Sequence, residues 1–289
     1  MEWVHRVRPE DVVPSAWASL GGDRFRVDGV WPRSHRFFGP VDGLHDPLLL
    51  VESMRQSTIL LSHAAYGVPL DSHFLMRSLD YTASPECLAV EVRDRIDIEV
   101  AFSEITRRGG RLAGMRSDLT VRRNGRTAGT GSSRIEILSA RAYCRVRGDR
   151  LRRSPLPPPE NGVPHQWVGR TRPEDVLLVP TARADRWQLR VDTGHSTLYQ
   201  GLKDHIPGMV LIEAARQAAH TAIGRAAFRA CAGTNTFHRY AEFGGPLWIR
   251  LEDLTTAGPD GTRVTVEGRQ DGEVAFVATL TARCPKRAR

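Results

Sequence analysis

The sequence predicts an α+β fold built from two similar units in tandem, each an antiparallel β-sheet wrapped around one long central helix. Three observations predict it: a set of motifs occurs twice in the same order, each copy holds one long helix-like segment, and strand-like segments follow each helix. A chain of 289 residues is long enough for two domains, each with a sizeable core.

Four matched motifs reveal the repeat. Residues 8–12 read Arg-Pro-Glu-Asp-Val, and residues 172–176 read the same. Each copy then has two histidines ten residues apart, an apolar run and a Glu-x-x-Arg-Gln motif. The matched side chains are His35, His45, Glu52, Arg55 and Gln56 in the first copy and His195, His205, Glu213, Arg216 and Gln217 in the second. Four matches in the same order are hard to obtain by chance, so the chain contains an internal duplication.

A proline-rich segment separates the two copies. Residues 154–162 read Ser-Pro-Leu-Pro-Pro-Pro-Glu-Asn-Gly, a composition that favours extended chain over a packed core. We therefore predict an N-terminal domain at residues 1–153, a linker at 154–164 and a C-terminal domain at 165–289.

Each copy has one segment with helical character. After the initial proline, residues 47–65 keep apolar side chains at helical spacing without Pro or Gly, and after the initial Pro207-Gly208 step residues 209–230 do so with Gly224 as a single interruption. Pro47 and Pro207 stand at the starts, where a missing N–H costs nothing.

Strand-like segments with alternating polarity follow each helix. They lie at residues 89–93, 114–122, 263–267 and 274–282, and Asp271-Gly272 is a hairpin signal. One helix per copy is too little for a parallel sheet with helices on both faces. A helix of about 20 residues spans roughly 30 Å, comparable to the width of a curved sheet of five or six strands. The pattern therefore predicts two hot-dog units.

The composition favours a cytoplasmic protein with an anionic partner. The formal charge of +8 would attract a phosphate ester, an acidic carrier protein or nucleic acid. Because the basic residues are scattered, a solvated surface is the simpler interpretation, and nucleic acid is not predicted. The longest aliphatic run, residues 48–51, is far too short to cross a membrane. No close pair exists among the four cysteines Cys87, Cys144, Cys231 and Cys284.

The two Glu-x-x-Arg-Gln motifs are the main candidates for chemistry. Within each motif the three side chains share one side of a helix. They could form a solvated face or an internal ion pair that neutralises itself. Alternatively, a glutamate removed from water has a raised proton affinity and can act as a general base, as we predict for Glu52 and Glu213. Arg55 or Arg216 could then bind a phosphate, and Gln56 or Gln217 could orient the substrate.

The start of the second helix is a candidate oxyanion site. Unpaired N–H groups at a helix start, with Gly208 allowing close approach, could stabilise a thioester carbonyl oxygen. We assign His205, which precedes this step, to the catalytic residues. His35, His45 and His195 are candidates for substrate binding or for holding the loop before each helix. The first copy has no matching glycine, and the sequence leaves open which half holds the reacting carbonyl.

Metal and nucleotide sites are not predicted. The sequence has no His-Glu-x-x-His motif and no paired cysteines. It also lacks a Gly-x-Ser-x-Gly motif and a phosphate-binding loop that ends in Gly-Lys-Ser/Thr. We therefore expect no cofactor and no metal.

Residues 207–217 resemble the Pro-Gly-x-x-x-x-Glu-Ala-x-x-Gln signature of hot-dog carrier-protein dehydratases. Together with residues 31–38, 46–52 and 74–76, the chain is similar over nearly its whole length to the A-factor (γ-butyrolactone) biosynthesis family. The resemblance implies two fused hot-dog domains, as a monomer or a homodimer. It implies transfer of a β-ketoacyl group from acyl carrier protein to the hydroxyl of dihydroxyacetone phosphate, towards butenolide and butyrolactone signals. One departure is that Gln200-Gly201 stands where the family commonly has Asp-His.

Two other functions stay open. Dehydration or thioester hydrolysis is the commoner work of this fold, and fold does not fix chemistry. The third alternative is a non-catalytic double hot-dog protein that binds acyl chains or a carrier protein.

Overall fold

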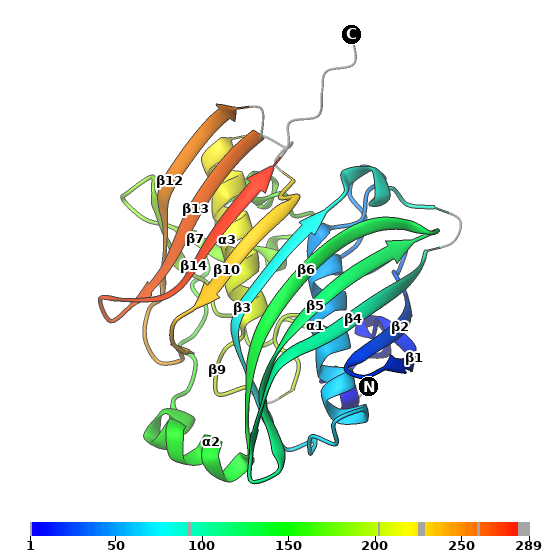
Figure 1. Ribbon diagram of the computed structural model, residues 1–289. Coiled ribbons are helices and arrows are strands. Elements are labelled where there is room, and N and C mark those ends of the chain that lie inside the picture. The colour runs from blue at the N-terminus through cyan, green and yellow to red at the C-terminus, as the bar shows by residue number, and fades with distance from the viewer. Residues whose placement is uncertain (1, 92–93, 202, 225–228, 259–260, 283–289) are drawn as a thin grey trace. The chain divides into compact units, whose positions relative to one another are not determined.

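The computed structural model describes residues 2–91, 94–201, 203–224, 229–258 and 261–282 (Figure 1). The chain divides into two compact units, Met1–Gly148 and Asp149–Arg289. The linker at residues 154–164 and the domain limits on either side of it stay a prediction.

The first unit is a six-stranded antiparallel sheet around helix α1 (Pro47–Ala64). The strand order is β1 (Pro14–Gly21), β2 (Arg24–Val30), β4 (Arg95–Arg108), β5 (Arg111–Arg123), β6 (Arg126–Leu138) and β3 (His73–Ala83). All residues of α1 except Arg55 and Ala64 are buried. This burial shows that α1 is a central helix, as Figure 1 illustrates by its position across one face of the strands.

The second unit repeats the arrangement around helix α3 (Gly208–Ile223). Its sheet has the order β10 (Ala232–Phe237), β14 (Glu273–Ala282), β13 (Gly261–Gln270), β12 (Trp248–Gly258), β8 (Arg186–Leu189) and β7 (Leu178–Pro180). A separate pair joins β9 (His205–Ile206) to β11 (Ala241–Glu242). Every residue of α3 from Met209 to His220 is buried. The prediction of two hot-dog units is confirmed.

Short helices complete both units. A helix that we did not predict, α2 (Ala140–Arg147), begins where the Ser139 hydroxyl accepts a hydrogen bond from the Ala142 N–H at 3.3 Å. The 3₁₀ turns are η1 (Glu2–Val4), η2 (Pro9–Asp11), η3 (Pro85–Cys87), η4 (Gly148–Arg152), η5 (His165–Val168) and η6 (Pro173–Asp175). Among the described residues, no helix is long and apolar enough to cross a membrane.

Two predictions about these elements were wrong. Gly224 does not continue the second helix but ends it, because it adopts a left-handed conformation (φ +71°) and returns its N–H to the His220 carbonyl. Residues 225–228 of the predicted helix lie outside the described residues. Residues 89–91 form no strand beyond one isolated bridge, and residues 92–93 are not described. The Arg123 side chain bonds the carbonyls of Cys87 and Ala89, which occupies acceptors that a strand ladder would use.

The strands after each helix agree with the remaining predictions. Residues 114–122 lie within β5, residues 263–267 within β13, and residues 274–282 within β14. Asp271 and Gly272 both have positive φ, which is the backbone conformation of a tight hairpin turn. Cys87, Cys144 and Cys231 are free thiols, and Cys284 lies outside the described residues.

Candidate active site

A buried ionic cluster forms around the glutamate of α1. Glu52 accepts hydrogen bonds from Arg6 Nε at 2.8 Å and from Gln56 Nε2 at 2.6 Å, both on Oε1. Arg55 Nε donates to the other carboxylate oxygen at 3.0 Å. The Glu52 side chain is 1% exposed. The glutamate of the motif is therefore bonded to the arginine and the glutamine of the same motif and to Arg6, near the start of the chain.

The second unit contains the same cluster. Glu213 Oε1 accepts from Arg170 Nε at 2.8 Å and from Gln217 Nε2 at 2.5 Å. Arg216 Nε donates to Oε2 at 2.7 Å, and its Nη2 also donates to the Val168 carbonyl at 3.2 Å. Arg216 Nε and Nη2 therefore both donate hydrogen bonds inside the unit, and the Glu213 carboxylate is fully buried.

The protonation of the two glutamates differs from our prediction. Burial alone would raise the pKa of Glu52 and Glu213, but the two guanidinium groups beside each carboxylate outweigh burial and lower each pKa to about 2. The expected raised proton affinity is therefore wrong. Both carboxylates are charged at neutral pH and have little tendency to accept a proton, so the geometry favours the internal ion pair, the first of the two interpretations considered above.

The glutamine of each motif fixes a backbone segment. Gln56 Nε2 donates to the Asp11 carbonyl at 2.7 Å, and its Oε1 accepts from the Val13 N–H at 2.9 Å. Gln217 repeats both bonds in the second unit at 2.8 Å each. An amide that pairs with a buried C=O and a buried N–H replaces a missing strand partner. The glutamines hold the Arg-Pro-Glu-Asp-Val segment against the central helix.

His35 and His195 connect the same segment to the following loop. His35 Nε2 lies 2.9 Å from the Asp11 carboxylate, while its Nδ1 accepts from the backbone N–H groups of residues 37–38. His195 makes the equivalent contacts, with Asp175 at 3.0 Å and two backbone donors. Because Nδ1 accepts, Nε2 carries the proton and donates to the aspartate. Substrate binding by these two histidines stays a prediction, and the geometry gives them a role in holding the loop.

The remaining two histidines differ strongly from each other. His45 is completely buried against Trp31, with Nε2 3.2 Å from Asp94, and burial lowers the pKa of this imidazole. His205 is partly exposed, its Nδ1 lies 2.8 Å from Asp204 Oδ1, and its ring meets Tyr240 edge-on. A carboxylate beside Nδ1 favours the tautomer that donates from Nδ1 to Asp204.

The two central helices also begin differently. In the first unit, the Asp46 carboxylate accepts the Leu48 N–H at 2.9 Å, so an acidic side chain already occupies the helix start. In the second unit, Pro207 is the residue before the helix and provides no side-chain cap. The Val210 and Leu211 N–H groups donate to the Pro207 carbonyl, so among the described contacts only the N–H groups of Gly208 and Met209 have no acceptor at this helix start.

Sequence reasoning missed the two arginines that complete the ionic clusters. Arg6 and Arg170 each lie two residues before the Arg-Pro-Glu-Asp-Val motif. Extending the repeat by two positions would have found them. Their partners were already singled out, and a buried carboxylate needs compensating charge. Among the described residues, no group of three or more histidine, cysteine or acidic side chains is arranged to hold a metal ion.

Comparison with known proteins adds the family. The model of the A-factor biosynthesis hotdog domain matches residues 1–139 and 152–286. Two relatives called 2-oxo-3-(phosphooxy)propyl 3-oxoalkanoate synthase are similar over 97% of this chain: one from Streptomyces coelicolor at 45% identity, covering 90% of that protein, and one from Streptomyces griseus at 46%, covering 94%.

A solved structure supports the fold independently. The 12:0-ACP thioesterase from Umbellularia californica aligns with a TM-score of 0.56 at 13% identity, over 92% of this chain and 99% of that one. At this identity the likeness concerns the fold alone. The duplicated motifs, the double hot-dog architecture and the relatives together establish that this chain belongs to the A-factor biosynthesis hotdog family.

Proposed function

We propose that the chain transfers a β-ketoacyl group from the thioester of an acyl carrier protein to the hydroxyl of dihydroxyacetone phosphate. The product would be a 2-oxo-3-(phosphooxy)propyl 3-oxoalkanoate, the compound in the names of the relatives. The observation that carries the proposal is the identity of 45–46% to these synthases over 97% of the chain.

The start of the second helix is the place that we assign to the reacting carbonyl. The acceptor hydroxyl oxygen would attack the thioester carbon, forming a C–O bond, and the C–S bond would then break. The backbone N–H groups of Gly208 and Met209 would stabilise the oxygen that becomes negative. The Asp46 carboxylate at the first helix start disfavours the same role there, since it would repel that charge.

His205 is the base in this proposal. Its Nε2 would take the proton from the acceptor hydroxyl and return it to the departing carrier thiolate, so the enzyme ends unchanged. Asp204, at 2.8 Å from Nδ1, would hold the ring orientation and stabilise the imidazolium. The pairing of His205 with a carboxylate and its position three residues before Gly208 support this choice.

Glu52 and Glu213 receive a positioning role in place of the predicted base role. Their charge is balanced by arginine, and each cluster fixes the chain segment that packs on its helix. In both Arg55 and Arg216, Nε and Nη2 donate to the glutamate of the same helix. Phosphate binding by either arginine therefore stays a prediction. The net charge of +8 agrees with two anionic substrates.

The test is identification of the product by mass spectrometry. The purified protein is mixed with β-ketoacyl carrier protein and dihydroxyacetone phosphate, with glycerol 3-phosphate as a matched acceptor in a second reaction. We expect the phosphorylated ester only with dihydroxyacetone phosphate. Release of free β-ketoacid at the same rate with and without acceptor would identify a thioesterase, and loss of water from a β-hydroxyacyl carrier protein would identify a dehydratase. Either result would overturn the proposal.

A further inference from the structure

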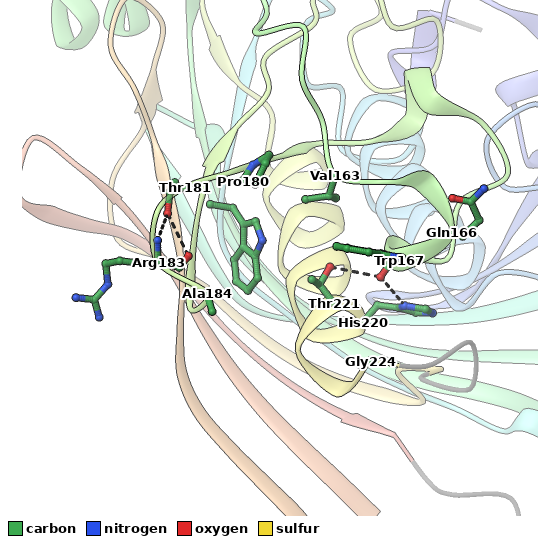
Figure 2. Close-up of a pocket in the computed structure, with 11 residues that line it drawn as sticks. Val163, Gln166, Trp167, Pro180, Thr181, Arg183, Ala184, His220, Thr221 and Gly224 are labelled. Carbon is green, nitrogen blue, oxygen red and sulfur yellow. Dashed lines mark hydrogen bonds between the residues drawn. The ribbon is translucent and has the colours of Figure 1, made fainter.

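The second unit contains a cavity of about 600 Å³ at the C-terminal end of α3 (Figure 2). Its walls come from η5, from the turn between β7 and β8, and from the end of the helix. The lining residues that matter for its chemistry are Trp167, Trp187, Pro180, Ala184, His220 and Thr221. A cavity of this size is in the range that holds a small molecule.

This cavity is separate from the start of the helix. From Gly208 to Thr221 the helix rises by 1.5 Å per residue, so the two places lie roughly 20 Å apart along its axis. A ligand in the cavity would not lie where we place the reacting carbonyl. The inference below therefore does not rest on the proposed function.

The repeat differs at one position that lies beside His220 of the cavity. Residues 166–170 read Gln-Trp-Val-Gly-Arg, and residues 2–6 read Glu-Trp-Val-His-Arg. Gly169 and its counterpart His5 both have positive φ, at +64° and +53°. In the first unit the His5 ring packs on His63 and Phe74. In the second unit Gly169 has no side chain, and even a Cβ there would come within 2.8 Å of His220 Nε2.

The charged groups of the lining are already neutralised. Arg183, at the rim, donates from Nε and Nη2 to both oxygens of Asp185, at 3.0 and 2.8 Å. Burial lowers the pKa of His220, whose Nδ1 bonds the Trp167 carbonyl at 2.9 Å, so the imidazole is neutral at pH 7. Among the described residues that line the cavity there is no carboxylate. Nothing in this lining would compensate the charge of an ionised ligand.

The polar groups are few and stand at the edges. Thr181 uses its hydroxyl on the Arg186 carbonyl at 2.7 Å, and Thr221 uses its own on the Gln217 carbonyl at 3.0 Å. Gln166 is an exposed member of the lining, and its amide offers a donor and an acceptor. Trp167 is 60% exposed, so its indole is accessible to a ligand.

We propose that this cavity binds an uncharged amphiphile, a molecule with an aliphatic chain and one neutral polar group. The chain would lie against Trp167, Trp187 and Pro180, and the polar group would face the exposed Gln166 amide.

The test uses 1-octanol as the probe and octanoate as its charged counterpart, by isothermal titration calorimetry on the full-length protein. We expect saturable octanol binding with one site per chain, and at least tenfold weaker binding of octanoate at pH 7. Trp167→Ala should weaken octanol binding at least tenfold, and Ala184→Leu, which fills part of the cavity from an exposed turn, should weaken it as well.

Trp3→Ala is the matched control, because Trp3 occupies the equivalent position of the first unit and is 47% exposed. We expect it to bind octanol like the unchanged protein. Circular dichroism on each variant confirms folding. The proposal is overturned by absence of saturable octanol binding, by equal affinity for octanoate, by a loss in Trp3→Ala as large as in Trp167→Ala, or by unchanged binding in folded Ala184→Leu.

Discussion

Replacement of Glu213 by glutamine separates the positioning role of this residue from a catalytic one. The substitution keeps the shape of the side chain and removes the buried negative charge that pairs with Arg170 and Arg216. A fall in pKa from the ordinary 4.5 to about 2, at 1.36 kcal/mol per pH unit, corresponds to roughly 3 kcal/mol of stabilisation by the ionised carboxylate. Breaking a buried ion pair from one side typically costs about 3–5 kcal/mol, so the two routes agree.

The assay is urea unfolding followed by tryptophan fluorescence, with acyl transfer measured on the same samples. Glu174→Gln is the control, because Glu174 is a partly exposed member of the same segment and pairs with Arg172 at 3.9 Å. We expect Glu213→Gln to lose about 3 kcal/mol in unfolding free energy, and the control to change by less than about 0.5 kcal/mol. A protein of normal stability whose turnover falls by roughly 10²- to 10⁴-fold would refute this reasoning and restore the glutamate as a base.

Three further outcomes follow from the same contacts. Both glutamates have a depressed folded-state pKa, so the stability that they give the folded protein is complete above pH 4.5 and is lost as the pH falls towards about 2. The urea midpoint of unfolding, measured as a function of pH, should fall over this range. A midpoint that stays constant between pH 5 and 2 would contradict this prediction. Gln217→Leu leaves the Leu177 N–H and the Asp175 carbonyl buried without the amide, and should cost about 1–3 kcal/mol in urea unfolding, whereas a neutral effect would mean that water replaces it. Gly224→Ala forces a side chain into the left-handed region and should cost about 1 kcal/mol; an unchanged thermal midpoint would show that the helix end shifts instead.

Much of the fold could be predicted because the duplication and the hydrophobic pattern agree. The repeat located both central helices to within a residue at their starts, and alternation located β5, β13 and β14. The prediction failed where the structure depends on a distant side chain or on a backbone conformation that the local sequence pattern does not show. Gly224 could continue or end a helix, and only its left-handed φ distinguishes the two.

The candidate site was less predictable than the fold. Spacing showed that Glu213, Arg216 and Gln217 share a helix face, but not that Arg170 would reach the same carboxylate from 43 residues away. The sign of the glutamate pKa depended on that missing partner, since burial and paired charge act in opposite directions. In the same way, the repeat matches His45 with His205 in position, but it does not show that one is enclosed beside Trp31 and the other partly exposed beside Asp204.

The central claim is that acyl transfer takes place at the start of the second helix with His205 as the base. The most direct test is the single-turnover rate of β-ketoacyl transfer to dihydroxyacetone phosphate by folded His205→Asn, at saturating carrier-bound substrate. We predict that this rate falls by roughly 10²- to 10⁴-fold while the thermal midpoint stays near that of the unchanged protein. A folded His205→Asn protein that transfers the acyl group at a near-normal rate would contradict the claim.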